Sequence, residues 1–244
     1  MIIASFNVKH NIFRNNKKTT SNIIDIIEKN RIDVLCLQEI PRSLARCFKR
    51  NMIEYSVNGD SRYHYIFKLL PYNEKIPIIT KNEVLFTKTI RYNNKINNVY
   101  EFFKYLFHIP IFSRIATIAI IKVNDEKKLC IINTHLDYKL KIMQEKQLNH
   151  LIKIINEYKE KYDIVLTGDF NMDESDEHFI RFINMIKSSG LNKTSINGYT
   201  WKGKNNKERT LDYIFVSSGL KLKNCGLIKS NNLSDHEIVY VNID

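Results

Sequence analysis

The sequence predicts a single globular domain over residues 1–244 in which helices and β-strands are mixed. The chain has 244 residues, 43% of them hydrophobic, enough to form one substantial core. Apolar runs of strand length are separated by longer segments whose apolar residues recur at helical spacing. No repeat at a fixed period and no long linker interrupts this pattern. We therefore expect one domain rather than two.

The first sixty residues alternate strand and helix. Ile2–Asn7 and Asp33–Glu39 are apolar runs of strand length. Between them, isoleucines recur along one face of a helix that a hydroxyl residue at 19–21 can cap. We expect the polar run at 15–18 to be a solvated loop. Pro41 is expected to begin a second helix, because proline fits the first helical turn.

The next fifty residues are less regular. Three short strands are expected, at Tyr63–Phe67, Ile76–Ile79 and Val84–Thr87, with turn residues between them. Between Asn93 and Ser113 the pattern has no clear period. Its aromatic run, Val99–Phe107, predicts either an amphipathic helix packed into the core or an exposed aromatic flap.

The second half of the chain is more regular. Ala116–Val123 and Leu129–Asn133 predict a pair of strands joined by a polar turn. Lys139–Tyr158 has apolar residues near helical spacing, so one face of this helix should lie on a sheet. The remaining expected elements are a helix at Glu177–Lys187, a turn-rich stretch to Arg209, and strands at Leu211–Val216 and Glu237–Ile243.

The run Ile164–Asn171 predicts a buried strand whose end carries chemistry. Its β-branched and leucine residues suit a strand covered on both faces. Gly168 allows the backbone to turn or to approach a ligand closely. Asp169 and Asn171 should point to the same side, because side chains alternate along an extended chain. The alternative is an Asx turn that closes an ordinary strand.

Charge and cysteine content indicate the kind of partner and compartment. The formal net charge is +12, which favours polyanionic partners such as nucleic acid or an anionic phospholipid surface. The competing explanation is a lysine-rich genome composition. The four cysteines show no Cys-x-x-Cys spacing. No leader segment and no transmembrane run is recognisable, so we expect a soluble, cytoplasmic protein. The oligomeric state is left open.

Polar residues gather at the ends of the predicted strands or in the loops beside them. Oxygen donors of this kind suit Mg²⁺, or Mn²⁺ as an alternative. Zinc is disfavoured, since its sites need Cys or His at short local spacing. A histidine beside a carboxylate can act as a general acid or base. Burying so many charges without partners costs several kcal/mol per ion, so a purely structural role is disfavoured. The residues are Asn7, Glu39, His135, Asp169, Asn171, Asp212, Asp235 and His236.

Five motifs, in this order, resemble the endonuclease/exonuclease/phosphatase superfamily, which includes deoxyribonuclease I-like and exonuclease III-like proteins. The resemblance covers nearly the whole chain and implies an α+β fold, a four-layer αββα sandwich of two packed mixed sheets with outer helices. The residues between Glu39 and Arg114 match no subfamily. The motifs are Gln38-Glu39, Asn133-Thr134-His135-Leu136-Asp137, Gly168-Asp169-Phe170-Asn171, Leu211-Asp212-Tyr213-Ile214-Phe215-Val216-Ser217 and Ser234-Asp235-His236.

The resemblance also implies a metal site and an activated water. Glu39 would hold Mg²⁺, and Asn7 would help to place the metal and a phosphate oxygen. Asp235 would complete the metal or water site. Asp169 and Asn171 would orient the nucleophilic water, and Asn171 would also contact the phosphate.

The histidines are expected to work on the phosphate. His236, oriented by Asp212, would polarise the water or stabilise the charge of the phosphorane-like transition state. His135 would face the phosphate and the leaving group. Arg114 resembles a phosphate-contacting arginine, whose planar fork suits phosphate. Glu83 is either the partner that orients His135 or a solvent-facing strand residue.

The predicted function is a Mg²⁺-dependent phosphoesterase that hydrolyses a phosphodiester by in-line attack of water. Net charge makes DNA or RNA the first expected substrate. The alternative is a phospholipid or phosphoinositide phosphoesterase, with the aromatic run Tyr100–Phe112 as an interfacial patch. A catalytically silent binding module is disfavoured because every motif is intact.

Overall fold

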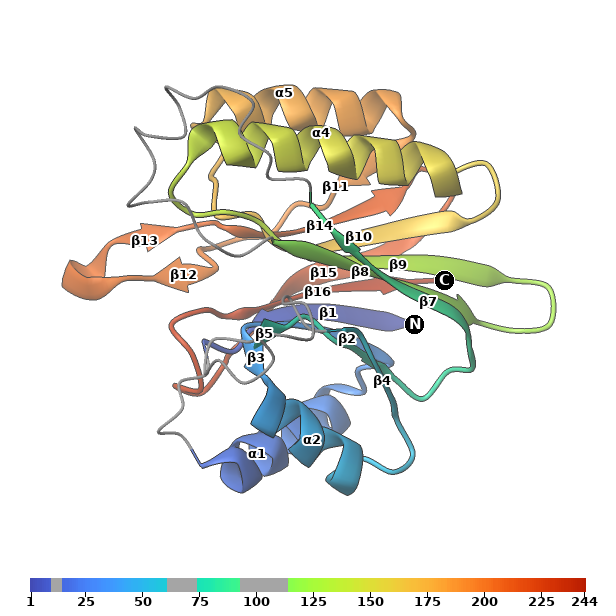
Figure 1. Ribbon diagram of the computed structural model, residues 1–244, viewed down its shortest axis with the longest axis vertical. Coiled ribbons are helices and arrows are strands. Elements are labelled where there is room, and N and C mark those ends of the chain that lie inside the picture. Colours follow the sequence, from blue (N-terminus) through green and yellow to red (C-terminus); the bar gives the residue numbers. More distant parts are fainter. Residues whose placement is uncertain (10–14, 61–73, 93–113) are drawn as a thin grey trace.

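Two six-stranded sheets pack face to face in this computed structural model, which describes residues 1–9, 15–60, 74–92 and 114–244 (Figure 1). The first sheet has the order β15 (Leu222–Ile228), β16 (Ile238–Ile243), β1 (Ile2–Asn7), β2 (Val34–Gln38), β6 (Ile78–Thr80) and β4 (Ser56–Asn58). The second has the order β11 (Leu191–Lys193), β14 (Asp212–Ser217), β10 (Asp163–Asp169), β9 (Lys128–His135), β8 (Ile115–Lys122) and β7 (Val84–Arg91).

Helices cover the outer face of each sheet, which confirms the expected four-layer αββα sandwich (Figure 1). The first sheet carries α1 (Asn16–Asn30) and α2 (Arg42–Asn51), and the second carries α4 (Lys141–Tyr158) and α5 (Glu177–Ser188). Two small antiparallel pairs, β3 (Ile40–Pro41) with β5 (Glu74–Lys75) and β12 (Trp201–Lys202) with β13 (Glu208–Arg209), and a short 3₁₀ turn at Lys204–Asn206 complete the described elements.

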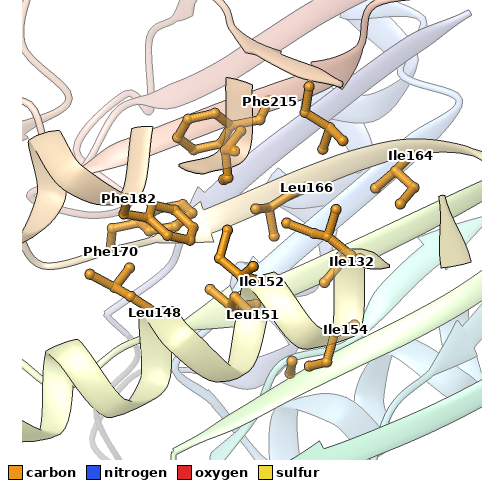
Figure 2. Packing of buried hydrophobic residues seen from close by; sticks show 14 of the residues in the cluster. Ile132, Leu148, Leu151, Ile152, Ile154, Ile164, Leu166, Phe170, Phe182 and Phe215 are labelled. Carbon is orange, nitrogen blue, oxygen red and sulfur yellow. The ribbon is translucent and has the colours of Figure 1, made fainter. Parts of the chain in front are cut away.

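The apolar core forms three layers because strand side chains alternate between two faces. On β10, Ile164 and Leu166 point to α4 and α5, whereas Val165 points into the space between the sheets. Figure 2 shows the outer layer, in which Leu151 of α4 and Phe182 of α5 pack on the second sheet. Strands β1, β2, β9 and β10 are therefore buried on both faces along most of their length, as the continuous apolar run of β10 predicted.

The helices begin close to their expected positions, with one correction. Helix α1 begins at Asn16, because the Asn15 side chain accepts a hydrogen bond from the Lys18 backbone N–H at 3.2 Å. The hydroxyl residues at 19–21 are not its cap, and the run at 15–18 is not a loop. An asparagine that accepts such a bond is a favourable N-cap, so the cap lies one turn earlier than expected. Pro41 immediately precedes α2, as expected.

Several strands were missed or shortened by the sequence interpretation. The expected hairpin is present as β8 and β9, which pair antiparallel. Strand β7 runs to Arg91, beyond the expected end at Thr87. The segments Tyr63–Phe67 and Val99–Phe107 lie outside the described residues. Strands β3, β4, β5, β11, β12, β13 and β15 were not expected; all but β15 are two or three residues long and have no apolar alternation to reveal them.

The thiols behave as small hydrophobic groups. Cys36 on β2 and Cys130 on β9 are buried, and burial raises the pKa of each thiol, that of Cys36 to about 12. All four cysteines are free. In the described part of the chain, no helix combines the length and apolar content needed to span a membrane.

Candidate active site

The space between the sheets changes from apolar to polar along the strands. Deep in this space, the Gln38 amide donates to Asn133 Oδ1 at 2.7 Å and to Ser5 Oγ at 3.1 Å. Asn133 in turn donates to the Leu37 carbonyl at 2.9 Å. These residues are fully buried, and an unpaired polar group there costs about 1 to 3 kcal/mol. The motif residues Gln38 and Asn133 therefore connect the two sheets.

Three strand ends of the second sheet place ionisable side chains in one row beyond this connection. In the strand register, Asp169 of β10 pairs with His135 of β9 on one side and with Asp212 of β14 on the other. All three lie on the strand face that carries Val165 and Ile131, so they point toward the first sheet.

The first sheet supplies the facing groups. Asn7 is the last residue of β1, Glu39 directly follows β2, and His236 precedes β16. Asn7 Nδ2 donates to Asp169 Oδ2 at 2.8 Å and lies 3.2 Å from Glu39 Oε1. Asn7 therefore bridges two carboxylates, and its own oxygen accepts from the Lys9 backbone N–H.

His236 and Asp212 form a buried pair across the two sheets. His236 Nδ1 lies 2.8 Å from Asp212 Oδ2. Burial by itself would lower the pKa of His236, but the carboxylates of Asp212, Asp169 and Asp235 raise it to about 10. The ring is therefore an imidazolium at neutral pH. The second oxygen, Asp212 Oδ1, is buried and has no hydrogen-bond partner among the described residues.

Asp169 lies between the two histidines. Its Oδ2 is 3.8 Å from His135 Nε2 and 3.9 Å from His236 Nε2. Burial and the Asp212 carboxylate raise the pKa of Asp169 to about 7, although His236 and the hydrogen bonds from Asn7 and the Asn171 backbone oppose this. A carboxylate with this pKa can exchange a proton near neutral pH.

Glu39 has the left-handed backbone conformation, with φ of 56°. This conformation is uncommon for a residue with a side chain and is often retained at functional sites. Glu39 Oε1 lies 3.8 Å from His135 Nε2, and its side chain remains 29% exposed. It is thus the carboxylate of the site that is most open to an incoming cation.

Arg114 lies at the end of the row next to His135. Its Nη1 is 2.9 Å from His135 Nδ1, and its buried Nε has no partner among the described residues. Nη1 also lies 3.1 Å from His135 Nε2. Because a guanidinium only donates, one of these two ring nitrogens accepts. Glu74 lines the same small pocket. The unpartnered Nε could donate to a phosphate oxygen, and the phosphate-binding role of Arg114 stays a prediction.

Glu83 cannot orient His135. It is exposed and precedes Val84, which pairs with Ile121, whereas His135 pairs with Ile115. These partners lie at opposite ends of β8, about 20 Å apart at about 3.3 Å per residue. Glu83 is therefore a solvent-facing strand residue, and the glutamates that lie near His135 are Glu39 and Glu74.

Asp235 has partners other than those expected. Its Oδ2 forms an ion pair with Lys9 and accepts from Trp201 Nε1 at 3.0 Å. Burial opposes the shift, but Lys9, His236 and Trp201 hold the pKa of Asp235 below its usual range. A role for Asp235 as a metal or water ligand stays a prediction, and it requires Lys9 to release the carboxylate.

The turn after β10 corrects the expected geometry of Asn171. The strand ends at Asp169, and Asn171 has φ of 54°, so simple alternation does not continue. The Asn171 backbone N–H donates to Asp169 Oδ1 at 2.8 Å, which is an Asx turn. The Asn171 side chain donates to the Leu136 carbonyl. The Asx turn therefore holds the Asp169 carboxylate in place.

Glycine is needed at position 168 because a neighbouring strand, and not a ligand, passes close to its backbone. Its φ is 149°, and a Cβ there would lie 2.1 Å from the Thr134 carbonyl oxygen. No side chain fits this space, so the expected close approach is to β9. The glycine thereby lets Asp169 lie beside His135.

The residues fit a divalent cation. Carboxylate oxygens dominate the site, and one of them, Asp212 Oδ1, is buried without a partner among the described residues. Asp169, Asp212 and His236 also place ligand atoms within 4.8 Å of one another. His236 Nδ1 is already held by Asp212 Oδ2 at 2.8 Å. The oxygen donors, Glu39 foremost, would hold the ion.

A four-layer sandwich with acidic and histidine groups where its two sheets meet is an arrangement suited to the hydrolysis of phosphoric esters. The family described as "Endonuclease/Exonuclease/phosphatase family" matches residues 4–236, and this chain belongs to that family. Its members use a divalent metal ion, and the expected resemblance is confirmed. A search of curated proteins finds no match.

Solved structures agree with this fold over the whole chain. An endonuclease/exonuclease/phosphatase from Bacteroides vulgatus is similar with a TM-score of 0.78 and 19% identity, covering 100% of this chain and 98% of that chain. A mannosyl-6-phosphatase from Bacteroides thetaiotaomicron has a TM-score of 0.76 and 16% identity, covering 100% and 99%. TDP2 from D. rerio, complexed with a single-strand DNA product, has a TM-score of 0.75 and 17% identity, covering 100% and 98%.

Four further residues near the site were not singled out from the sequence. Lys9 and Trp201 bind Asp235, Glu74 lies near His135, and the Tyr138 ring lies 6.0 Å from the Arg114 guanidinium carbon. Lys9 follows an expected strand end and Tyr138 follows a motif, so proximity to those motifs was a usable signal. Trp201 and Glu74 lie in short strands that local patterning does not reveal.

Proposed function

We propose that this protein is a Mg²⁺-dependent phosphodiesterase that hydrolyses nucleic acid. The observation that carries the proposal is the position of Asp169, whose carboxylate lies 3.8 and 3.9 Å from two imidazoles. A phosphate at this place would have a proton acceptor and two charge-stabilising groups around it.

The pKa values assign the roles. Asp169, with a pKa of about 7, accepts the proton of the attacking water. His236, with a pKa of about 10, is already protonated, so it stabilises the charge that develops on the phosphorane-like transition state. This supports the second of its two expected roles. Asp212 holds the ring through Nδ1, and the Asx turn at Asn171 orients Asp169.

Arg114 and His135 bind the phosphate on the other side of Asp169. Glu39, with Asn7 holding its carboxylate, would hold Mg²⁺. When bound, the ion supplies charge neutralisation at the phosphate and at the leaving oxygen. Mn²⁺ has the same ligand preferences and is the alternative.

Two observations support nucleic acid as the substrate. The net charge is +12, and a similar structure, that of D. rerio TDP2, contains a single-strand DNA product. The similar mannosyl-6-phosphatase indicates that the same fold also serves sugar phosphates. The aromatic segment 100–112 that would support a lipid substrate lies outside the described residues.

The test is hydrolysis by the purified protein with Mg²⁺, Mn²⁺ or a chelator. The substrates are single-stranded DNA, RNA, plasmid DNA, mannose 6-phosphate, sphingomyelin and inositol phosphates. We expect metal-dependent cleavage of a nucleic acid, loss of activity in Asp169→Asn, and retention in Asp163→Asn at the opposite end of β10. Cleavage of only a sugar phosphate, an inositol phosphate or a lipid would overturn the proposed substrate.

Binding of Asp169→Asn to nucleic acid gives an independent measurement. Each phosphate contact contributes about −0.9 to the slope of log affinity against log salt on duplex DNA, and about −0.7 on single strands. We expect a slope of several units. A slope near zero would mean that the lysines are scattered and do not form a binding surface.

A further inference from the structure

A groove of about 870 Å³ begins at His236 and lies beside the β12–β13 hairpin. The hairpin projects from the end of the sandwich at which the catalytic strands finish (Figure 1). Pockets of this volume hold small ligands in proteins. Because His236 lines the groove and its Nε2 lies 3.9 Å from Asp169 Oδ2, the groove adjoins the catalytic centre.

The groove carries no excess positive charge. Each of its two lysines is paired with a glutamate of the same groove: Lys202 with Glu208 at 3.4 Å, and Lys229 with Glu237 at 3.2 Å. Asp235 adds a third carboxylate, which is paired with Lys9. Each further nucleotide of a strand brings another negative phosphate. These lining residues are therefore a poor path for a continuing strand.

The groove is better suited to one uncharged ring. Tyr199 lines it with 57% of its surface exposed, and an exposed aromatic ring is a stacking platform for a nucleobase. Asn197 and Asn232 also line it, and asparagine amides pair with base edges. Aromatic stacking with amide hydrogen bonds is how proteins bind an unpaired base.

The opposite end of the catalytic row carries two cationic side chains, Arg114 and Lys139, together with the Glu74 carboxylate. Arg114 precedes β8, and Asp212, the partner of His236, lies on β14. Three strand spacings of about 4.8 Å, or roughly 14 Å in all, separate these two strands. Lys139 is exposed there, with its Nζ 5.1 Å from the centre of the Tyr138 ring. A cation beside an exposed ring suits both a base and its phosphate.

We propose that the groove beside His236 holds the terminal nucleoside of a single strand and that the rest of the strand leaves over Tyr138 and Lys139. The protein then acts at a strand end rather than internally. This inference rests on the proposed nuclease function. In the reaction the water oxygen bonds to phosphorus and gives its proton to Asp169. The bond from phosphorus to the leaving sugar oxygen breaks, and that oxygen takes up a proton from solvent water and departs as a hydroxyl. Asp169 then returns the proton that it accepted to solvent.

The test compares one single-stranded oligonucleotide in linear and ligated circular form, as DNA and as RNA, with Mg²⁺. The circle has no end and must place a phosphate in the groove. We expect it to be cleaved about 5- to 1000-fold more slowly, the range that one like-charge contact at about 4 Å produces. Linear strands labelled at either end identify the terminus that is removed first.

Variants of Tyr199 test the groove itself. Tyr199→Ala should raise KM for the linear strand about 5- to 150-fold, the effect of losing one stacked base. Tyr199→Phe keeps the ring and should keep KM. Phe86→Ala removes an exposed ring on β7, at the edge of the second sheet away from β14, and serves as the matched control for a surface aromatic.

The outcomes separate this inference from the proposed function. Equal cleavage of circular and linear strands would overturn end-directed action while leaving the nuclease intact. The same holds if Tyr199→Ala leaves KM unchanged. Cleavage of neither form, together with hydrolysis of another phosphoester, would overturn the nuclease function and with it this inference.

Discussion

Replacement of Asp212 by Asn tests whether Asp212 and His236 act as one unit. Both side chains are buried, and His236 Nδ1 lies 2.8 Å from Asp212 Oδ2. A nearby opposite charge shifts a pKa by about 1 to 3 units, and each unit corresponds to about 1.4 kcal/mol. Asp212→Asn should therefore lower the pKa of His236 and weaken the imidazolium by roughly 1 to 4 kcal/mol. Turnover should fall about 10- to 1000-fold.

The assay is steady-state hydrolysis by Asp212→Asn, by His236→Ala and by the double variant, together with an NMR titration of His236. Residues that act as one unit give non-additive losses, so the double variant should lose little more than the worse single variant. Asp125→Asn, in the exposed turn between β8 and β9, is the matched control. Additive losses, or an unchanged titration of His236 in Asp212→Asn, would refute the reasoning.

Three further predictions concern the metal, the backbone and pH. Glu39→Gln should keep the thermal stability but lose most activity, with little rescue by excess Mg²⁺. The surface variant Glu54→Gln, as a control, should keep its activity. Full activity of the wild-type protein in a chelator would contradict the metal site. Gly168→Ala should lower the free energy of unfolding, measured by chemical denaturation, by roughly 4 kcal/mol or more, because the new Cβ would meet the Thr134 carbonyl. Gly190→Ala, at a position with φ of 85° and open space, should lower it by only about 1 to 2 kcal/mol. Equal losses would show that the close approach at Gly168 is unimportant. The folded pKa of His236 is raised to about 10 from 6.5, so its stabilising contribution is complete below pH 6.5 and is lost as pH rises through about 10. The difference in unfolding temperature between wild type and His236→Gln should therefore shrink from pH 7 to pH 10.5. A constant difference would contradict the raised pKa.

Local patterning was sufficient for the long elements. The continuous apolar run of β10 and the helical spacing in α4 are strong periodic signals, and both elements are present within a few residues of the expected bounds. Patterning failed where elements are short. The two-residue strands β12 and β13 have no period to detect, although their hairpin lies beside the groove at His236.

The residue types of the site were recognisable in the sequence, since each one follows or precedes an apolar strand. Their contacts were not. Asn7 and Asp169 are 162 positions apart and are joined by a hydrogen bond of 2.8 Å. Glu83 and Glu74 illustrate the same limit, because only strand pairing shows that Glu83 lies at the opposite end of β8 from His135.

The amino-acid sequence by itself determined which residues alternate into the space between the sheets, because the direction of a strand side chain depends on local backbone geometry. The sequence thereby placed Asp169, His135 and Asp212 on the same strand faces as the apolar residues that point toward the first sheet. The tertiary structure alone decided that their strands are neighbours and that Asn7 and His236 lie opposite them. Strand order depends on pairing between distant segments, and the raised pKa values of Asp169 and His236 exist only once those segments bury several charges together.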